Sequence, residues 1–143
     1  MMYIPIKEYR CGVELINIYE CLCDRTRLRI LSLLAKGPLC VCHVQSILGE
    51  SQVKVSKHLG YLKSRGLVVA TKEANWRVYG LVAKPNRALR ANLACLQDCA
   101  QDDEVFRRDA QKLTKLKAGL GADGPSCCLL PKPGRSLRAR ASV

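Results

Sequence analysis

The chain has 143 residues, which is enough for one domain with its own core and too few for two ordinary domains. Lysine and arginine number 24 against 12 acidic residues, giving a net charge of +12, so we expect a polyanion such as nucleic acid as partner. Charge alone fits a solvated basic surface equally well. A hydrophobic content of 48% with only 5% aromatic residues predicts a mainly helical, aliphatic core and argues against a disordered chain.

Nine cysteines are many for this length, but their number is odd and the first residues lack the pattern of a signal peptide. No apolar run approaches the roughly 20 residues that cross a bilayer, so we expect no membrane partner. We therefore expect a cytoplasmic protein. In that compartment thiols stay reduced, and clustered cysteines bind metal or sense redox state more often than they form disulfides.

Two helices are predicted in the first quarter of the chain. Residues 12–23 repeat apolar side chains near helical spacing, which predicts a first helix with one apolar face. Residues 25–36 repeat leucine and isoleucine in the same way, with Asp24 placed to cap this second helix and Gly37-Pro38 to end it. Because the second helix is so apolar, we expect it at the centre of the core.

A helix-turn-helix motif is predicted next. Residues 39–48 form an expected short third helix that ends at Gly49. Ser51 is placed to cap a fourth helix, which runs to residue 64 or 65 and stops at Gly66. Two short helices joined by a tight turn that contains glycine are typical of helix-turn-helix proteins.

Two segments rich in β-forming residues follow the fourth predicted helix. Residues 67–73 and 76–82 are separated by Ala74-Asn75, which predicts a hairpin. A hairpin in this place is the wing of a winged helix. The predicted fold class is therefore mainly α with a β-hairpin wing, a winged helix-turn-helix.

A long last helix is predicted over residues 86–117. It carries an apolar stripe, and no remaining segment of the chain is available to cover that stripe. Because uncovered apolar surface needs a partner, we expect a homodimer through this terminal helix. The stripe consists of Leu89, Leu93, Leu96 and Ala100.

The expected organisation has three parts. Residues 1–11 form an N-terminal arm, and residues 12–118 form the winged helix-turn-helix domain with its C-terminal dimerisation helix. Residues 119–143 are rich in glycine, proline, serine and basic side chains, which predicts a basic disordered tail.

The fourth predicted helix has the charge of a DNA-binding surface. Between Glu50 and Glu73 the charged residues are five lysines and arginines, without an acid among them. The first turns of a recognition helix enter the major groove, where such side chains reach base edges and phosphates. An ordinary surface helix is the alternative, and the hairpin that follows argues against it. The residues predicted to bind DNA are Ser51, Gln52, Lys54, Ser56, Lys57 and His58 in the helix, with Lys72 and Arg77 in the hairpin.

Two thiols, Cys40 and Cys42, stand at the start of the third predicted helix. At roughly 100° per residue Cys40 falls at the edge of the apolar face and Cys42 on the opposite side, so packing explains Cys40 better than Cys42. Thiols two residues apart on a regular helix point apart, and one ion takes both only at an irregular first turn, which Gly37-Pro38 favours. Thiolates select soft ions: As(III), Sb(III), Cd(II), Pb(II), or Zn(II) with a nitrogen donor. Binding would reshape the helix that supports the recognition helix.

Four segments together resemble the arsenical-resistance repressors of the ArsR/SmtB winged-helix family, over about residues 13 to 117. The resemblance implies a homodimer on a palindromic operator, which represses resistance genes and is released when a metalloid or metal binds. It also implies that Cys40 and Cys42 bind the ion. The segments are Leu39-Cys40-Val41-Cys42-His43, Ser51-Gln52 with Val55-Ser56-Lys57-His58-Leu59, Gly66-Leu67-Val68 and Trp76-Arg77-Val78-Tyr79.

The resemblance leaves the third ligand open. Arsenic-responsive members often carry a third cysteine where this chain has Gln45, and an aspartate where it has His43. Cys11 is a candidate by analogy with cadmium- and lead-sensing members that add N-terminal thiols. Cys95 and Cys99 stand four residues apart and offer a separate soft-metal pair, although we expect them to be buried at the dimer seam. His43 is expected to be a solvated or capping residue more often than a ligand.

The leading prediction is a repressor released by thiol-bound As(III) or Sb(III). Alternatives of the same fold respond to Cd(II), Pb(II) or oxidation, or hold a purely structural Zn(II). A thiol enzyme is not expected, because Cys42 and His43 have no glycine-rich oxyanion loop or orienting acid nearby. Cys21 and Cys23 are expected to pack at the core, whereas Cys127-Cys128 in the tail lacks fixed geometry.

Overall fold

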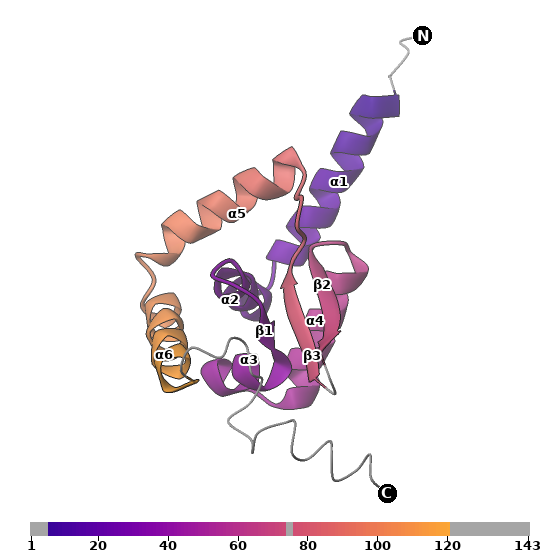
Figure 1. Ribbon diagram of the computed structural model, residues 1–143. Helices are drawn as coiled ribbons and strands as arrows, with labels where there is room; N and C mark the ends of the chain where they lie inside the picture. Colours follow the sequence, from indigo (N-terminus) through magenta and orange to yellow (C-terminus); the bar gives the residue numbers. More distant parts are fainter. Residues whose placement is uncertain (1–5, 74–75, 121–143) are drawn as a thin grey trace, which may run out of the picture.

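The computed structural model describes the backbone of residues 6–73 and 76–120, and the side chains of residues 14–72 and 77–119. These ranges contain six helices and three short strands (Figure 1). The mainly helical class with a β-hairpin is confirmed. The elements are α1 (Ile6–Leu22), α2 (Arg25–Leu34), β1 (Leu39–Cys40), α3 (Val41–Leu48), α4 (Gln52–Ser64), β2 (Val68–Glu73), β3 (Trp76–Leu81), α5 (Arg87–Ala100) and α6 (Glu104–Leu120).

Helix α2 is the centre of the core, as predicted. The Asp24 side chain caps it by accepting a hydrogen bond of 3.0 Å from the backbone N–H of Arg27. The helix contacts α1, α3, α4, α5 and α6, and its side chains from Ile30 to Leu34 are buried. Burial of these aliphatic side chains is the main force that holds the other helices around α2.

The helix-turn-helix is formed by α3 and α4, in the predicted place. Gly49 ends α3 with a positive φ of 68°, which a residue without Cβ adopts without strain. Ser51 then caps α4, accepting a hydrogen bond of 3.3 Å from the N–H of Lys54. Three buried residues, Val55, Leu59 and Leu62, hold one face of α4 on the core.

The sheet has the strand order β1-β3-β2, and its neighbouring strands are antiparallel. Strands β2 and β3 form the predicted hairpin, with Val68 opposite Leu81. The prediction of a helix from residue 39 is wrong for the first two residues. Leu39 and Cys40 have extended backbone and pair with β3, and both side chains are buried, so α3 begins at Val41.

The prediction of one helix over residues 86–117 is also wrong. Helix α5 ends at Ala100, and α6 begins at Glu104 and turns back onto α2 and α3 (Figure 1). The break follows from Asp103, whose side chain accepts hydrogen bonds from the N–H groups of Val105 and Phe106 at 2.9 and 3.4 Å. A carboxylate in this position starts a new helix rather than continuing the old one.

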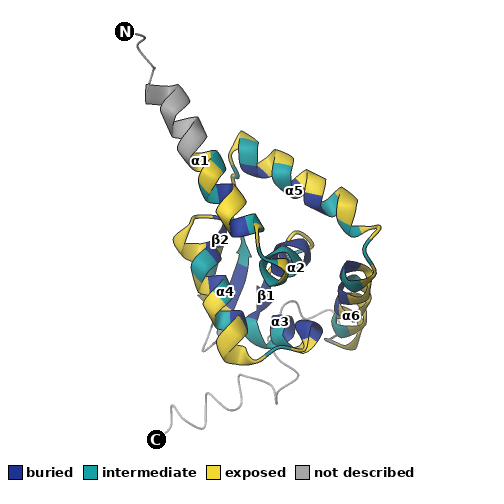
Figure 2. Cartoon of the chain, turned by 180° about the vertical axis from the view of Figure 1, so that it is seen from behind, coloured by how far each residue is buried: buried dark blue, intermediate teal, exposed yellow. Residues whose placement is uncertain are grey.

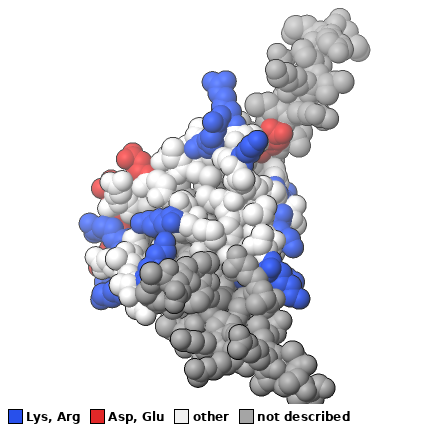
Figure 3. Space-filling view, viewed as in Figure 1, with Lys and Arg blue, Asp and Glu red and all other residues white. Residues whose placement is uncertain are grey.

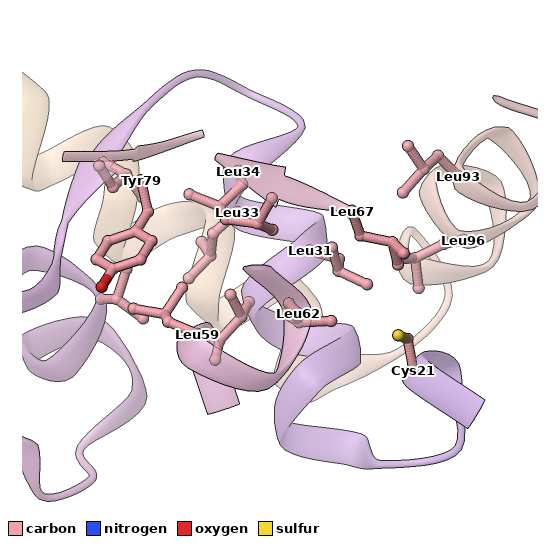
Figure 4. Close-up of a cluster of buried hydrophobic side chains, with 14 of the residues drawn as sticks. Cys21, Leu31, Leu33, Leu34, Leu59, Leu62, Leu67, Tyr79, Leu93 and Leu96 are labelled. Carbon is pink, nitrogen blue, oxygen red and sulfur yellow. The ribbon is translucent and has the colours of Figure 1, made fainter. Parts of the chain in front are cut away.

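The apolar stripe of α5 is covered within the chain, contrary to our expectation. Leu89, Leu93 and Leu96 are buried, and the buried face of α5 points toward the centre of the molecule (Figure 2). Leu93 and Leu96 lie in the same cluster as Leu31 and Cys21 (Figure 4). The stripe therefore gives no argument for a second copy of the chain, and any dimer interface has to use another surface.

The ends of the chain differ in part from the predicted boundaries. Helix α1 begins at Ile6, inside the expected arm, and α2 ends two residues earlier than predicted, at Leu34. Most of the expected tail, residues 121–143, lies outside the described residues. Among those that are described, there is no helix with the length and apolar character to cross a membrane.

Candidate DNA-binding surface and thiol site

Helix α4 presents three faces to its surroundings. Val55, Leu59 and Leu62 face the core, which leaves the first turn with Gln52 and Val53 exposed. The predicted DNA-binding residues divide between the two remaining faces. Lysine and arginine side chains outnumber acidic side chains on the molecular face shown in Figure 3.

One face of α4 borders a groove of about 690 Å³ between this helix and the hairpin. Gln52 and Ser56 line the groove from α4, and Arg77 and Tyr79 line it from β3. Lys72 pairs directly with Arg77 across the hairpin. Two like charges in opposite positions destabilise a hairpin on their own, so an anion between them would relieve their repulsion. The groove thus joins predicted residues of the helix and of the wing.

The other face of α4 carries Lys54, which is exposed, and His58, which is half-buried. The ammonium of Lys54 forms an ion pair of 3.0 Å with Glu50, and His58 lies beside Asp24, the cap of α2. Burial raises the pKa of Asp24, but the N–H of Arg27 and the nearby positive charges, His58 included, lower it more, so the net shift is downward. His58 and Lys54 therefore already have partners within the chain, whereas Lys57 is exposed and forms no ion pair among the described residues.

Three residues of this surface were not among those predicted from the sequence. Val53 is 79% exposed, although valine is apolar. Lys63 and Ser64 line the same groove as Gln52. A helical wheel oriented by the buried residues Val55 and Leu59 would have found them, because it places Val53 away from the core.

Cys40 and Cys42, the thiols of what we call the α3 site, come together at an irregular helix start, which is the condition we expected for one ion to bind both. Cys40 belongs to β1 and is also the residue before α3, with an extended backbone (φ −86°, ψ 163°). Cys42 lies in the first turn of α3. Their Sγ atoms are 2.7 Å apart. One atom can therefore reach both sulfurs, which a regular helix would forbid.

A nitrogen donor completes this group. The ligand atoms of Cys40, Cys42 and His43 all lie within 4.8 Å of one another, the one group of three or more such donors in the part of the chain that the structure describes. His43 is 2% exposed, so the expectation of a solvated residue is wrong. Burial lowers the pKa of His43, which favours the neutral imidazole that binds metals. Two soft sulfurs and one nitrogen suit a soft or borderline ion.

The other cysteines are spread over the chain. Cys21 is buried in the core as predicted, and burial raises its pKa. Cys23 is exposed, so its predicted packing at the core is wrong, and Cys95 and Cys99 are exposed as well. The side chain of Cys11 and the pair Cys127-Cys128 lie outside the described residues.

Helix α3 and strand β1 connect the thiols to α4 and to the hairpin. It packs against α4, and β1 pairs with β3 so that Cys40 is opposite Val78. At the other end of α3, the ammonium of Lys112 in α6 donates a hydrogen bond of 3.3 Å to the carbonyl of Ile47. A displacement of Cys40 or Cys42 would therefore act directly on α4 and on the β2–β3 hairpin.

Known proteins resemble this chain in sequence and in structure. Residues 24–69 match the family described as bacterial regulatory protein, arsR family. The chain is 32% identical over 112 residues to the arsenic resistance transcriptional regulator ArsR1 of Pseudomonas putida, covering 78% of this chain and 84% of that protein. It is 42% identical over 67 residues to the arsenical resistance operon repressor of Escherichia coli, covering 46% of this chain and 57% of that protein.

Two solved structures carry the same fold. The homodimeric winged helix-turn-helix DNA-binding domain Mb0332 from Mycobacterium bovis has a TM-score of 0.58 and 25% identity, covering 71% of this chain and 92% of that one. HlyU from Vibrio cholerae has a TM-score of 0.56 and 28% identity, covering 62% of this chain and 92% of that one. These relatives are regulators rather than enzymes. The chain therefore belongs to the ArsR family of bacterial regulatory proteins and is a DNA-binding transcription regulator with the winged helix-turn-helix fold.

Proposed function

We propose that this protein is a homodimeric repressor that leaves its operator when As(III) or Sb(III) binds the thiolates of Cys40 and Cys42. The observation that carries the proposal is the contact of two sulfurs, 2.7 Å apart, at the start of the helix that supports α4. Thiolates select soft ions, which include trivalent arsenic and antimony. The names of two relatives, an arsenic resistance regulator and an arsenical resistance operon repressor, point to the same class of inducer.

The operator is bound by α4 and the hairpin. Gln52 and Ser56 face the groove together with Arg77, so helix and wing contact the same stretch of DNA. Lys57 and Lys72 are exposed and contact phosphates, and Val53 meets a base edge. Lys54 and His58, also predicted to bind DNA, have to give up their contacts with Glu50 and Asp24 in order to do so.

The second copy of the chain docks on α1. Ile16 is 62% exposed and Tyr19 is 53% exposed, and they lie one turn apart on the same face of this helix. Exposed large apolar side chains in a row are typical of an interface. The solved domain from Mycobacterium bovis is a homodimer of the same fold, which supports this state.

Ion binding weakens the hold on DNA through α3. An ion bonded to both sulfurs fixes the end of β1 and the first turn of α3 in one geometry. Because β1 pairs with β3 and α3 packs on α4, the relative position of wing and recognition helix changes with it. A coupling of about 1–3 kcal/mol, which is roughly a 5–150-fold loss of operator affinity, is enough for a useful switch.

The test measures release of operator DNA by arsenite, antimonite, Cd(II) and peroxide. Wild type should lose operator affinity about 5–150-fold with arsenite, and Cys42→Ser should keep it. Cys23→Ser is the matched control, because it removes an exposed thiol away from α3 and should respond as wild type does. If arsenite leaves the wild-type complex intact, or releases the Cys42→Ser complex equally well, the proposal is wrong.

Cd(II), Pb(II) or Zn(II) is the second candidate inducer, and the buried His43 favours it. A nitrogen donor beside two sulfurs suits these borderline ions better than it suits arsenic. His43→Leu keeps an apolar side chain in the buried position. It should weaken Zn(II) and Cd(II) binding by about 10–100-fold and leave arsenite-driven release unchanged if arsenic uses only the thiolates.

A further inference from the structure

A second thiol pair lies on α5, away from the α3 site. Cys95 and Cys99 stand one helical turn apart on this helix, and both are exposed. The neighbouring Cys95 side chain raises the pKa of the Cys99 thiol. Side chains four residues apart lie on the same face of a helix, so the two sulfurs are in a position to bond to one atom.

Beside this pair is an open pocket of about 340 Å³. Cys99 lines it together with Leu96 from α5, Phe106 from α6, and Leu22 and Leu28 from α1 and α2. The volume lies at the lower end of the roughly 300–1,000 Å³ typical of small-molecule sites. The pocket thus offers apolar surface for a small organic group directly next to a thiol.

The pair supplies two donors but not three. Among the described residues, the group with three adjacent donors is the one in α3, and the thiol of Cys23, also in the pocket wall, donates a hydrogen bond of 3.0 Å to the carbonyl of Glu20. Trivalent arsenic makes three bonds. An arsenical with two hydroxyl groups that thiolates can replace, and one organic group that stays on the arsenic, therefore fits this site better than inorganic arsenite does.

We propose that Cys95 and Cys99 bind a trivalent organoarsenical, R–As(OH)₂, with its organic group R in the pocket. Two As–S bonds form and two As–O bonds break. The two thiol protons leave with the two hydroxides as two molecules of water. Arsenic remains trivalent and its bond to carbon stays intact, so the step needs no oxidant or reductant.

The test uses the full chain with the thiols of α3 and residues 127–128 removed. The background variant is C40S/C42S/C127S/C128S, and the probes are phenylarsenous acid, methylarsenous acid and arsenite. Native mass spectrometry should show one phenylarsenic adduct per chain in the background, and no stable adduct after the further change Cys99→Ser or Cys95→Ser. No adduct in the background, or an adduct that persists in the Cys99→Ser variant, would overturn the proposal.

Cys23→Ser in the same background is the matched control, and it should keep the adduct. If Cys23→Ser loses the adduct while Cys95→Ser keeps it, arsenic binds Cys23 rather than Cys95, and the proposed pair on α5 is wrong. Since the background lacks Cys40 and Cys42, none of these outcomes bears on the inducer site in α3.

The role of the pocket has its own variant, Ala100→Leu. Ala100 lines the pocket, and a larger side chain there takes the space of the organic group while both thiols remain. Calorimetry should show that phenylarsenous acid binds about tenfold more weakly and methylarsenous acid changes less than about threefold. Equal losses for both probes, or arsenite binding to the background as tightly as phenylarsenous acid, would show that the pocket plays no part. An unchanged thermal unfolding curve establishes that the variant folds.

Discussion

The thiols of α3 and the thiols of α5 offer the same two donors in different surroundings. Cys40 is 1% exposed and belongs to a strand, and Cys42 lies in the first turn of the helix that packs on α4. Cys95 and Cys99 are exposed on α5, a helix whose main contacts in the described chain are with α1 and α2. From this difference we expect the pair in α3, and not the pair on α5, to control DNA binding, because the first pair joins β1 to the helix that packs on α4.

Helix α6 packs on α2 and α3, and its Phe106 lines the pocket beside Cys99, so a change that detaches α6 should have the largest effect. The guanidinium of Arg29 donates two hydrogen bonds, of 2.8 and 2.9 Å, to Asp109 of α6, and both side chains are largely buried. The Asp109 carboxylate raises the pKa of Arg29. Asp109→Ala leaves a buried positive charge without its partner, which should cost about 3–5 kcal/mol of unfolding free energy in a urea titration.

The matched control for this change is Arg108→Ala. It removes an ion pair of 2.6 Å with Glu104 on the same helix, but both of those side chains are 66% exposed. Water screens such a pair, so the loss should stay below about 1 kcal/mol. Similar losses in both variants would contradict the view that Asp109 fastens α6 to α2.

The comparison also predicts which thiol pair releases DNA. Phenylarsenous acid at a saturating concentration should change the operator affinity of Cys40→Ser/Cys42→Ser less than about twofold, because α5 has no extensive contact with α3 or α4 among the described residues. The same reagent should lower the affinity of Cys95→Ser/Cys99→Ser by about 5–150-fold. Fluorescence anisotropy of labelled operator measures both. The reverse order would make α5 the regulatory site.

Local sequence signals predicted the parts of the fold that local forces determine. The caps Asp24 and Ser51, the stop at Gly49 and the apolar repeats of α2 and α4 are each set by a few neighbouring residues, and they were confirmed. The closeness of Cys40 and Cys42 followed in the same way from the irregular start of α3.

The parts that depend on packing could not be predicted. The helical pattern runs through residue 103, and only the partners of Asp103, in α6 and at Arg25, show that a new helix starts there. Because α6 then folds back, the stripe of α5 is covered by the chain itself. The two-residue strand at Leu39 and the burial of His43 likewise depend on neighbours that are distant in the sequence.

Val53→Ala is the change with the smallest expected effect. It should weaken recognition of the operator sequence without altering release of the operator by arsenite. Val53 is exposed in the first turn of α4, where an apolar side chain meets the methyl group of a thymine. Val53→Ala should weaken binding to an operator selected from random duplexes by about 3–10-fold, while arsenite still releases the complex. Replacing each thymine by uracil removes its methyl group alone. At one position this replacement should weaken the wild-type complex by a few-fold and leave the Val53→Ala complex unchanged. If every thymine-to-uracil replacement weakens the wild-type and Val53→Ala complexes equally, Val53 contacts no thymine. If Val53→Ala also reduces the release of DNA by arsenite, sequence recognition and release both depend on the same part of α4.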